Sequence, residues 1–462
     1  MVARIVAQLR TLEQTTRPVG PELKAALERR WEELPAHVKT PAQALGRRTA
    51  GCEGTHGVFP RCNLACTPCY HSREANRVRT DGSHTVDEVD RQMSYLASQR
   101  GPGQNAQLIG GEVTLLEPDD HAEALLAMRR HGRKPMSMTH GDFDYAYLER
   151  LVLGPDGEVR LPHLSFAGHF DSMMFGRRGI KRVTSEKDLN EHRRRFCEMF
   201  ERLEREHGVT HFLAHNMTVT PRNIDQVAQV VKDCRDMGFR MFSFQPAAFV
   251  GNTNRWRDSY REFSGDEVWA EVERGAGARL PYKVLQIGDE RCNRTAYGAV
   301  VGARWIPILD DRVPADHAVR DEFFRAFGGM DFDVAPGVLA ARLARAFARH
   351  PAMLTGAAAW LKRFAMRAGA WSLVRTRPRA LTFVMHSFMD ATDVKPAWEG
   401  LRRGEMSDEP RIRATQERLQ ACSYAMSHPE SDELVPACVQ HSVLDPRENL
   451  KLQELLPLVP AA

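Results

Sequence analysis

The sequence predicts an α/β fold: a partial (β/α)6 barrel with a helical N-terminal extension and a mixed C-terminal extension. Between residues 51 and 250, short apolar runs typical of buried strands alternate with amphipathic helical segments. This alternation is the pattern of βα units around a parallel sheet. Six such units make about three-quarters of an eight-stranded barrel, in which the chemistry takes place on loops at the C-terminal ends of the strands.

The six candidate strands are short and mainly apolar. Two of the intervening helices have capping-box spacing at their starts, Thr85 with Glu88 and Ser185 with Asp188. We expect the strands near 57–59, 106–110, 135–140, 163–168, 211–219 and 241–246.

The chain of 462 residues is long for a single domain. We expect a helical extension at 1–50 and the barrel at 51–250. An irregular and then basic helical region should follow at 251–380. A C-terminal region that could carry an auxiliary cluster should occupy 381–462.

Composition narrows the class of protein. The net charge of +4 is too small to imply nucleic acid by itself. No run of eighteen apolar residues predicts a transmembrane helix, and the N-terminus lacks the features of a signal peptide. Nine cysteines, three of them within eight residues, indicate metal ligation rather than a disulfide framework. We therefore expect a cytoplasmic protein.

The three crowded cysteines lie in FPRCNLACTPCYHS, where Cys62, Cys66 and Cys69 have the spacing C-x3-C-x2-C. Soft thiolate ligands select iron–sulfur clusters or zinc. Three thiolates can bind three corners of a cubane cluster and leave one iron open. The alternative is a zinc knuckle completed by His71, but zinc sites favour a second cysteine pair a dozen or more residues away. No such pair occurs here, so we favour iron and sulfur.

A second motif, QLIGGEVTLL, ends the next expected strand with Gly110, Gly111 and Glu112. Two glycines at a strand end let a ligand approach the backbone and expose N–H groups. The acidic side chain can bind an ammonium group. Alone, this motif is more often a plain turn.

Together, the cysteine spacing and the glycine motif resemble the radical S-adenosylmethionine (SAM) superfamily. The resemblance implies that Cys62, Cys66 and Cys69 are catalytic and hold a [4Fe–4S] cluster whose open iron chelates S-adenosyl-L-methionine. It also implies that Gly110, Gly111 and Glu112 hold the SAM amino group. Reductive cleavage of SAM would produce a 5′-deoxyadenosyl radical that abstracts hydrogen from an unactivated carbon. The implied partner is an electron donor such as flavodoxin or ferredoxin.

Further SAM contacts are implied at the strand ends, where the family places ribose and carboxylate contacts. An ordinary core or strand-end role fits these residues equally well. His140 and His169 reach the same rim, where a substrate acid/base is one interpretation and a structural histidine the favoured one. The family usually has an aromatic residue before its third cysteine, whereas this chain has Pro68 there and Tyr70 just after. The candidate contacts are Tyr70, Thr139, Ser165, Asn216 and Gln245.

Three loop cysteines form a candidate auxiliary cluster, Cys292, Cys422 and Cys438. The alternative is that they are unrelated thiols; Cys52 is a candidate further ligand. The run FVMHSFMD and the later VPACVQHS resemble the C-terminal part of tetraether-synthase-type radical SAM proteins, which join lipid tails. That resemblance implies a lipid or acyl-chain substrate and a second [4Fe–4S] cluster.

A basic amphipathic segment occupies 336–380. No acidic residue lies between Asp333 and Asp390, whereas nine basic residues do, interleaved with Leu, Phe and Trp. This pattern is typical of an interfacial helix on an anionic membrane. The alternatives are an ordinary helix with a solvated cationic face and a nucleic-acid surface, for which no reading motif is found. We expect no nucleic-acid partner and a peripheral membrane contact here. The basic residues are Arg342, Arg345, Arg349, Lys362, Arg363, Arg367, Arg375, Arg377 and Arg379.

Two other functions stay open at this point. One is a radical SAM maturase of a peptide or protein, although residues 1–50 lack the strand pattern of a peptide-recognition domain. The other is a non-catalytic iron–sulfur or zinc-binding protein on a degenerate barrel.

Overall fold

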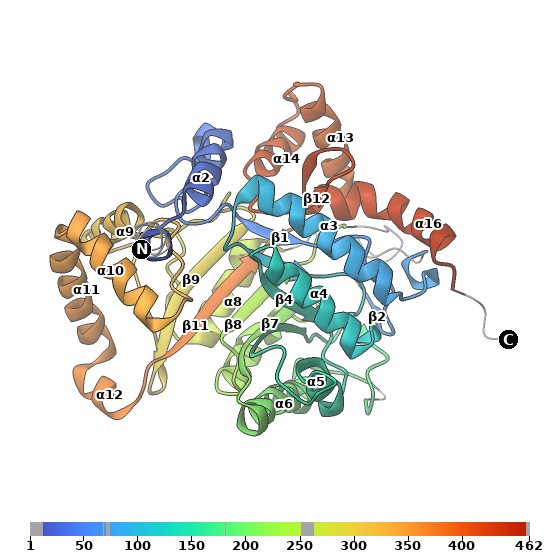
Figure 1. Ribbon diagram of the computed structural model, residues 1–462, viewed down its shortest axis with the longest axis horizontal. Coiled ribbons are helices and arrows are strands. Elements are labelled where there is room, and N and C mark those ends of the chain that lie inside the picture. The colour runs from blue at the N-terminus through green and yellow to red at the C-terminus, as the bar shows by residue number, and fades with distance from the viewer. Residues whose placement is uncertain (1–12, 68, 71–73, 181, 251–262, 459–462) are drawn as a thin grey trace, which may run out of the picture.

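A single curled sheet organises the molecule. The computed structural model describes residues 13–67, 69–70, 74–180, 182–250 and 263–458. The sheet has eleven strands in the order β10-β9-β11-β8-β7-β5-β4-β3-β1-β12-β13 (Figure 1). Its strands are β1 (Cys52–Gly54), β3 (Asn105–Leu108), β4 (Lys134–Thr139), β5 (His163–His169), β7 (Thr210–Val219), β8 (Met241–Pro246), β9 (Asn293–Val301), β10 (Arg304–Pro307), β11 (Arg379–His386), β12 (Tyr424–His428) and β13 (Glu433–Pro436).

Six neighbouring parallel strands, β1, β3, β4, β5, β7 and β8, form the centre of the sheet in chain order. This arrangement confirms the predicted partial (β/α)6 barrel. Two further parallel strands extend it, β12 beside β1 and β11 beside β8. Antiparallel β9, β10 and β13 complete the edges.

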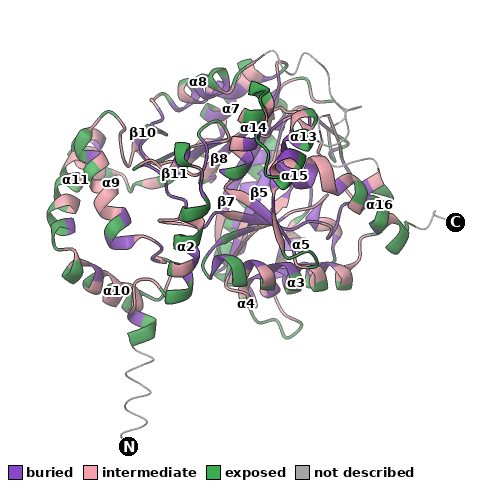
Figure 2. Cartoon of the chain, turned by 90° about the horizontal axis from the view of Figure 1, so that it is seen from above, coloured by how far each residue is buried: buried purple, intermediate pink, exposed green. Residues whose placement is uncertain are grey.

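Side chains of the sheet alternate between a packed face and a cavity face, as the two-residue period of a strand requires. In β7, Leu213 and Met217 belong to the main hydrophobic core, whereas Thr210, Asn216 and Thr218 line a cavity. The core lies between the sheet and the helices α3 (Gly82–Arg100), α4 (Pro118–Arg130), α5 (Tyr145–Val152), α6 (Asn190–His207), α7 (Val227–Cys234) and α8 (Gly265–Ala276) (Figure 2).

Two expectations at the start of the barrel are wrong. The first strand is Cys52–Gly54 and not 57–59, because Gly57, at φ +65°, turns the chain out of the sheet. The cap of α3 is Asp81, whose side chain accepts from the His84 N–H, whereas the Thr85 hydroxyl donates to the carbonyls of Val58 and Asp81. The Ser185–Asp188 capping box is confirmed.

The stretch 263–330, which we expected to be irregular, contains α8, β9, β10 and α9 (Pro314–Phe327). It is ordered because β9 pairs along its length with β11, a strand that follows 78 residues later. Residues 251–262 lie outside the described part of the chain.

Helical groups flank the two edges of the sheet. The expected N-terminal helix is α2 (Pro21–Glu33), and the expected helices of the basic segment are α10 (Pro336–Arg349), α11 (Ala352–Ala368) and α12 (Ala370–Arg375). Of these, α10 and α11 pack against α9, α11 also contacts β10, and α12 packs against α11. Near β12 lie α13 (Ala391–Arg402), α14 (Pro410–Gln420), α15 (Ala437–Val439) and α16 (Asp445–Leu455). No helix in the described part of the chain is long and apolar enough to cross a membrane.

A buried ion pair joins the first strand to the start of β4. The Arg133 guanidinium donates to both carboxylate oxygens of Glu53 at 3.0 and 3.1 Å, and both side chains are 0% exposed. We predict that Arg133→Met lowers the free energy of unfolding by about 3–5 kcal/mol, because it leaves a buried carboxylate unpaired. Chemical denaturation measures this. Arg130→Met, which removes an exposed ion pair with Asp90, should leave the transition nearly unchanged; an equal loss in both variants would contradict the prediction.

Candidate active site

A cavity of about 1780 Å³ occupies the inner face of the sheet. Thr210 and Thr218, near the two ends of β7, both line this cavity. At a rise of about 3.3 Å per residue, the cavity therefore extends about 26 Å along the strand. The structure brings all the predicted site residues into its wall: Cys62, Cys66, Cys69, Tyr70, Gly110, Gly111, Glu112, Thr139, Ser165, Asn216, Gln245, Cys292, Cys422 and Cys438.

The cysteine loop is held at the C-terminal edge of the barrel strands. Cys66 lies in β2 (Ala65–Cys66), which pairs with β6 (Met174–Phe175). The backbone N–H of Cys62 donates to Asn76 Oδ1 at 3.1 Å. Burial raises the pKa of the Cys62 thiol to about 12. For Cys66, burial and then Cys69 raise the pKa well above its ordinary value. Both thiols are therefore held in their protonated form. The positive charge of a bound metal would favour the thiolate form, which is the form that ligates.

The zinc alternative at the cysteine loop stays a prediction that the described residues do not test. His71, the fourth ligand of the zinc interpretation, lies outside the described residues, as does Pro68.

Gly110 and Gly111 allow the cysteine loop to approach the end of β3. The Gly111 N–H donates to the Phe59 carbonyl at 2.6 Å, and the Glu112 N–H donates to the Arg61 carbonyl at 2.9 Å. A Cβ on Gly111 would lie 2.0 Å from the Arg61 oxygen, and one on Gly110 would lie 2.7 Å from the Phe59 ring. The N–H groups that we expected to be exposed at Gly111 and Glu112 are thus already bonded to the loop.

The Glu112 carboxylate is 1% exposed and accepts several hydrogen bonds. Thr139 Oγ1 donates at 2.7 Å, the His140 N–H at 2.8 Å and Thr114 Oγ1 at 2.6 Å. Among the described residues, no lysine or arginine forms an ion pair with Glu112; its only such neighbour is His140, at 3.4 Å. A buried carboxylate without a cationic partner suits the ammonium of a ligand.

His140 has a structural role in this arrangement. Its Nδ1 accepts from the Asp142 N–H at 3.0 Å, so its Nε2–H donates to Asn63 Oδ1 at 2.7 Å, within the cysteine loop. Burial lowers the pKa of His140 below its usual value, which favours this neutral form. The favoured interpretation of His140 therefore agrees with the geometry.

The other predicted polar residues differ in their environment. Ser165 lies in the middle of β5, beside His163 at 3.2 Å, rather than at the rim. Tyr70 donates to the Gly110 carbonyl at 2.8 Å. Asn216 is 5% exposed. Gln245 donates from Nε2 to Ser243 Oγ at 2.7 Å, while its buried Oε1 has no hydrogen-bond partner among the described residues. That unpaired acceptor is available to a ligand bound in the cavity.

His169 bonds to a carboxylate that sequence reasoning missed. Its Nε2 lies 2.7 Å from Asp171 Oδ2. Burial alone would raise the pKa of Asp171, but hydrogen bonds from His169 and the Met173 and Thr218 N–H groups outweigh burial and lower it. Asp171 follows a strand end and lines the cavity, so its position in the sequence could have identified it.

Arg177 was also missed, and no sequence signal marks it. It is 3% exposed and donates to the carbonyls of His140 at 2.7 Å and His169 at 3.2 Å. Its positive charge lowers the pKa of Cys66, although burial dominates at that thiol. A buried guanidinium beside the loop would balance the negative charge of a thiolate-bound cluster.

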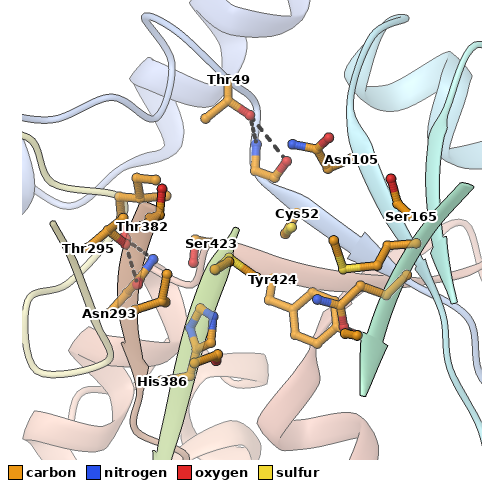
Figure 3. Close-up of a pocket in the computed structure, with 18 of the residues that line it drawn as sticks. Thr49, Cys52, Asn105, Ser165, Asn293, Thr295, Thr382, His386, Ser423 and Tyr424 are labelled. Atoms are coloured by element: carbon orange, nitrogen blue, oxygen red, sulfur yellow. Dashed lines mark hydrogen bonds between the residues drawn. The ribbon is translucent and has the colours of Figure 1, made fainter. Parts of the chain in front are cut away.

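The three candidate auxiliary cysteines converge on another part of the same cavity wall. Arg418 Nε donates to Cys292 Sγ at 3.0 Å, and Cys422 Sγ donates to the Tyr424 carbonyl at 3.0 Å. Burial, then Cys422 and Cys292, raise the pKa of Cys438 to about 12. Cys52 lies nearby, paired in register with Tyr424 (Figure 3). Arg418 can stabilise a thiolate at Cys292.

The comparisons with known proteins give a distant likeness of fold. No protein-family model and no curated protein matches this chain. Among solved structures, SuiB of Streptococcus suis bound to precursor peptide SuiA is 16% identical, with a TM-score of 0.29, and the match covers 42% of this chain and 38% of that one. The structure of anSMEcpe with bound AdoMet and Cp18Cys peptide is 15% identical, with a TM-score of 0.33. That match covers 48% of this chain and 57% of that one.

A second anSMEcpe structure, with bound AdoMet, is 14% identical, with a TM-score of 0.28. The match covers 42% of this chain and 50% of that one. The chain thus matches less than two thirds of the length of each of these proteins. Similarity at this level carries no argument about activity, which must come from the site itself.

We predict that Gly111→Ala displaces the cysteine loop, because its Cβ has no space against the Arg61 carbonyl. The overpacking should cost about 1–3 kcal/mol of stability and lower the iron bound per chain after anaerobic reconstitution. Gly337→Ala is the matched control, since nothing lies within 4 Å of its Cβ position. Unchanged iron content in Gly111→Ala would show that the loop does not need this close approach.

Proposed function

We propose that this chain is a radical SAM enzyme that abstracts hydrogen from an unactivated carbon of a lipid or acyl chain. The observation that carries the proposal is the cysteine loop packed on the Gly110–Glu112 strand end, at one end of a long cavity. The chemistry that the bound groups supply is one-electron reductive cleavage of SAM to methionine and a 5′-deoxyadenosyl radical, which takes a hydrogen atom from the substrate. Flavodoxin or ferredoxin would provide the electron.

The residues present fit these groups. Cys62, Cys66 and Cys69 would hold the [4Fe–4S] cluster, and buried Arg177 would offset its negative charge. Glu112, which has no basic partner among the described residues apart from His140, would bind the SAM ammonium. The unpaired Oε1 of Gln245 would accept a hydrogen bond from SAM. The roles of Tyr70, Thr139, Ser165 and Asn216 toward SAM remain part of this proposal.

The far end of the cavity supports an apolar substrate. Aromatic and aliphatic side chains line it, many of them from α9, α10 and α11. A peptide or protein substrate, the alternative class, would need polar groups for its backbone there. The length of about 26 Å along β7 suits an extended chain. The apolar lining includes Phe323, Phe327, Phe332, Leu343, Phe347, Met353 and Trp360.

Two cations at that end suit an anionic group on the substrate. Arg48 and Arg240 line the cavity, and neither forms an ion pair with a described carboxylate. Burial lowers the pKa of Arg48, whose guanidinium lies 5.4 Å from the centre of the Phe332 ring. A carboxylate or phosphate head group bound by these arginines would leave the apolar tail directed toward the cysteine loop.

The basic segment supports a peripheral membrane contact, although fewer cations are free than its composition suggests. Arg363 and Arg367 pair with buried Asp316, and Arg379 pairs with Asp236. Lys362, Arg375 and Arg377 have no ion-pair partner among the described residues. The helices α11 and α12 also carry exposed apolar side chains, namely Leu354, Leu361, Met366, Trp371 and Val374.

We predict that anaerobic reconstitution of the full chain yields about eight irons, because two sets of thiols line the cavity. Incubation with SAM and dithionite should then produce 5′-deoxyadenosine. Cys66→Ala should lose about four irons and all of this product. Cys422→Ala should lose about four irons and retain the product. Iron analysis and chromatography measure both.

The outcomes separate the alternatives. If the parent chain binds about four irons and Cys422→Ala binds the same number, the auxiliary cluster is ruled out. The proposed enzyme activity is not ruled out by that result. Absence of 5′-deoxyadenosine from a chain with full iron content would instead support a non-catalytic iron–sulfur protein. Cys197→Ala is the matched control, since this buried thiol lies in the main core outside the cavity.

We predict that the full chain sediments with vesicles containing phosphatidylserine at low salt. Trp371 is 68% exposed. Trp371→Glu should weaken binding about tenfold, because burial of one large apolar side chain contributes about 1.5–3 kcal/mol. Leu450→Glu, at an equally apolar but distant exposed position on α16, should bind like the parent. Equal loss in both variants, or no sedimentation at low salt, would contradict the membrane contact.

A further inference from the structure

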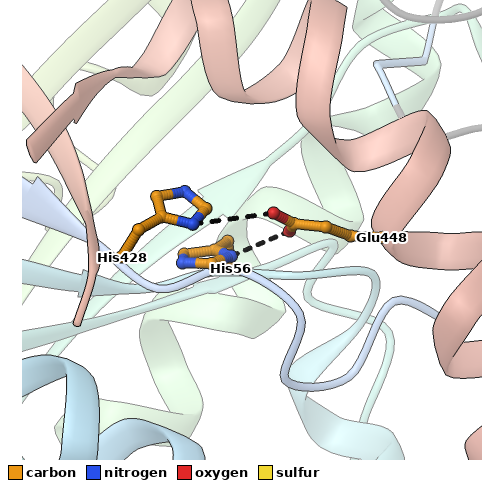
Figure 4. Close-up of side chains that lie close together, drawn as sticks. All are labelled: His56, His428 and Glu448. Carbon is orange, nitrogen blue, oxygen red and sulfur yellow. Dashed lines mark hydrogen bonds and ion pairs between the residues drawn. The ribbon is translucent and has the colours of Figure 1, made fainter. Parts of the chain in front are cut away.

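Two histidines and a glutamate meet outside the cavity, on the far side of β1 and β12. His56 lies in the turn after β1, His428 ends β12, and Glu448 lies on α16. One ligand atom of each lies within 4.8 Å of the others (Figure 4). His56 is 8% and His428 5% exposed. Three segments far apart in the sequence thus place three metal-ligating groups together.

The outer nitrogens of both rings are already bonded to oxygen acceptors. His56 Nε2 lies 2.7 Å from the Ser427 carbonyl, and His428 Nε2 lies 2.6 Å from Gln440 Oε1. Both Nε2 atoms must therefore carry hydrogen, which leaves each Nδ1 able to act as a ligand. A metal-binding histidine typically donates its other N–H to a carbonyl or carboxylate in this way.

The orientation of Gln440 is fixed by its own bonds. Its Nε2 donates to Glu448 Oε2 and to Asp445 Oδ1, both at 2.8 Å. The amide oxygen therefore faces His428. A carboxylate ligand that accepts such a hydrogen bond is also held in one orientation, which prepares it to bind a metal.

The three groups lie close enough to share one ion, although the two imidazole rings are stacked with centres 4.1 Å apart, so one ring must turn for both Nδ1 atoms to face the ion. His56 Nδ1 lies 2.9 Å from Glu448 Oε2, and His428 Nδ1 lies 3.7 Å from Glu448 Oε1. Ligands around zinc lie about 3.3 Å apart, given Zn–N and Zn–O bonds of about 2.0–2.1 Å. A second carboxylate is at hand as the fourth ligand, since Glu430 Oε1 lies 3.2 Å from His428 Nδ1. Arg91 orients Glu430 at 2.7 Å.

We propose that His56, His428 and Glu448, completed by Glu430, form a structural Zn²⁺ site. Two imidazoles and carboxylates are ligands that zinc accepts, and four protein ligands leave no open position. The donor set alone would also suit a catalytic iron ion. However, none of these four residues lines the cavity, so a substrate bound in the cavity would not reach the ion, and a structural site fits better. The site shares no residue with the candidate active site and does not depend on the proposed function.

Zinc at this position would fasten the C-terminal segment to the barrel. His56 precedes the cysteine loop by six residues, whereas His428 and Glu448 flank Cys438 in the sequence. The ion would therefore hold both sets of thiols in one frame. Without metal, the same atoms form only an ion pair between His56 and Glu448.

Metal analysis of the full chain, expressed in medium that contains zinc, tests the site. We expect about one zinc per chain in addition to the iron. His428→Gln and Glu448→Gln should each lose at least about nine-tenths of the zinc and keep the iron, whereas Cys66→Ala should lose iron and keep the zinc. His207→Gln is the matched control, because His207 belongs to a more exposed group with Glu149 and Glu206.

Thermal unfolding gives a second readout that does not depend on the variants folding well. A zinc chelator should lower the melting temperature of the parent, because a metal that binds only the folded state stabilises it. Zinc, but not magnesium, should restore it. Less than one-tenth of a zinc per chain in the parent would overturn the proposal, as would equal zinc in His428→Gln and the parent. Either result would leave the ion pair as the role of these residues.

Discussion

The buried Glu112 carboxylate organises the end of the barrel where the cysteine loop lies. A charged group at 1% exposure is costly unless it is hydrogen-bonded. Thr139 and His140, from the end of β4, provide those bonds, and His140 in turn bonds to Asn63 in the cysteine loop. One carboxylate thus joins two strand ends to the loop. These bonds leave Glu112 without an ion pair to a lysine or arginine among the described residues, although the charge of Arg177 acts on it from beyond ion-pair distance.

The alternation of side chains along the strands explains how one sheet can be both a core and a cavity wall. Phe242 and Phe244 of β8 belong to the hydrophobic core, whereas Ser243 and Gln245 face the cavity. Burial on one face stabilises the barrel, so the other face is free to vary in chemistry. It is polar near the cysteine loop and mainly apolar near α9–α11.

Local patterns in the sequence predicted most of the barrel and much of the site. Five of the six strands were found because each is an apolar run bounded by turns. The first was misplaced because VFP at 58–60 is apolar but belongs to the turn that leads into the cysteine loop, with Phe59 in the core. The cysteine motif and Glu112 were found because both sets of residues are adjacent in the sequence. Asp171 follows a strand end and could have been found in the same way, whereas Asn63 and Arg177 depend on contacts between segments that no local pattern reveals.

Long-range pairing also explains what the C-terminal segment contributes. Because β12 joins β1 as a parallel neighbour, Cys422 is brought next to the first strand of the barrel, although 370 residues separate it from Cys52. Cys438 follows on α15, and His441 beyond it packs against Tyr70 with ring centres 4.5 Å apart. Both sets of thiols therefore line one cavity. The C-terminal strand pairs directly with the first barrel strand, so it acts as part of the cavity wall and not as an appended domain.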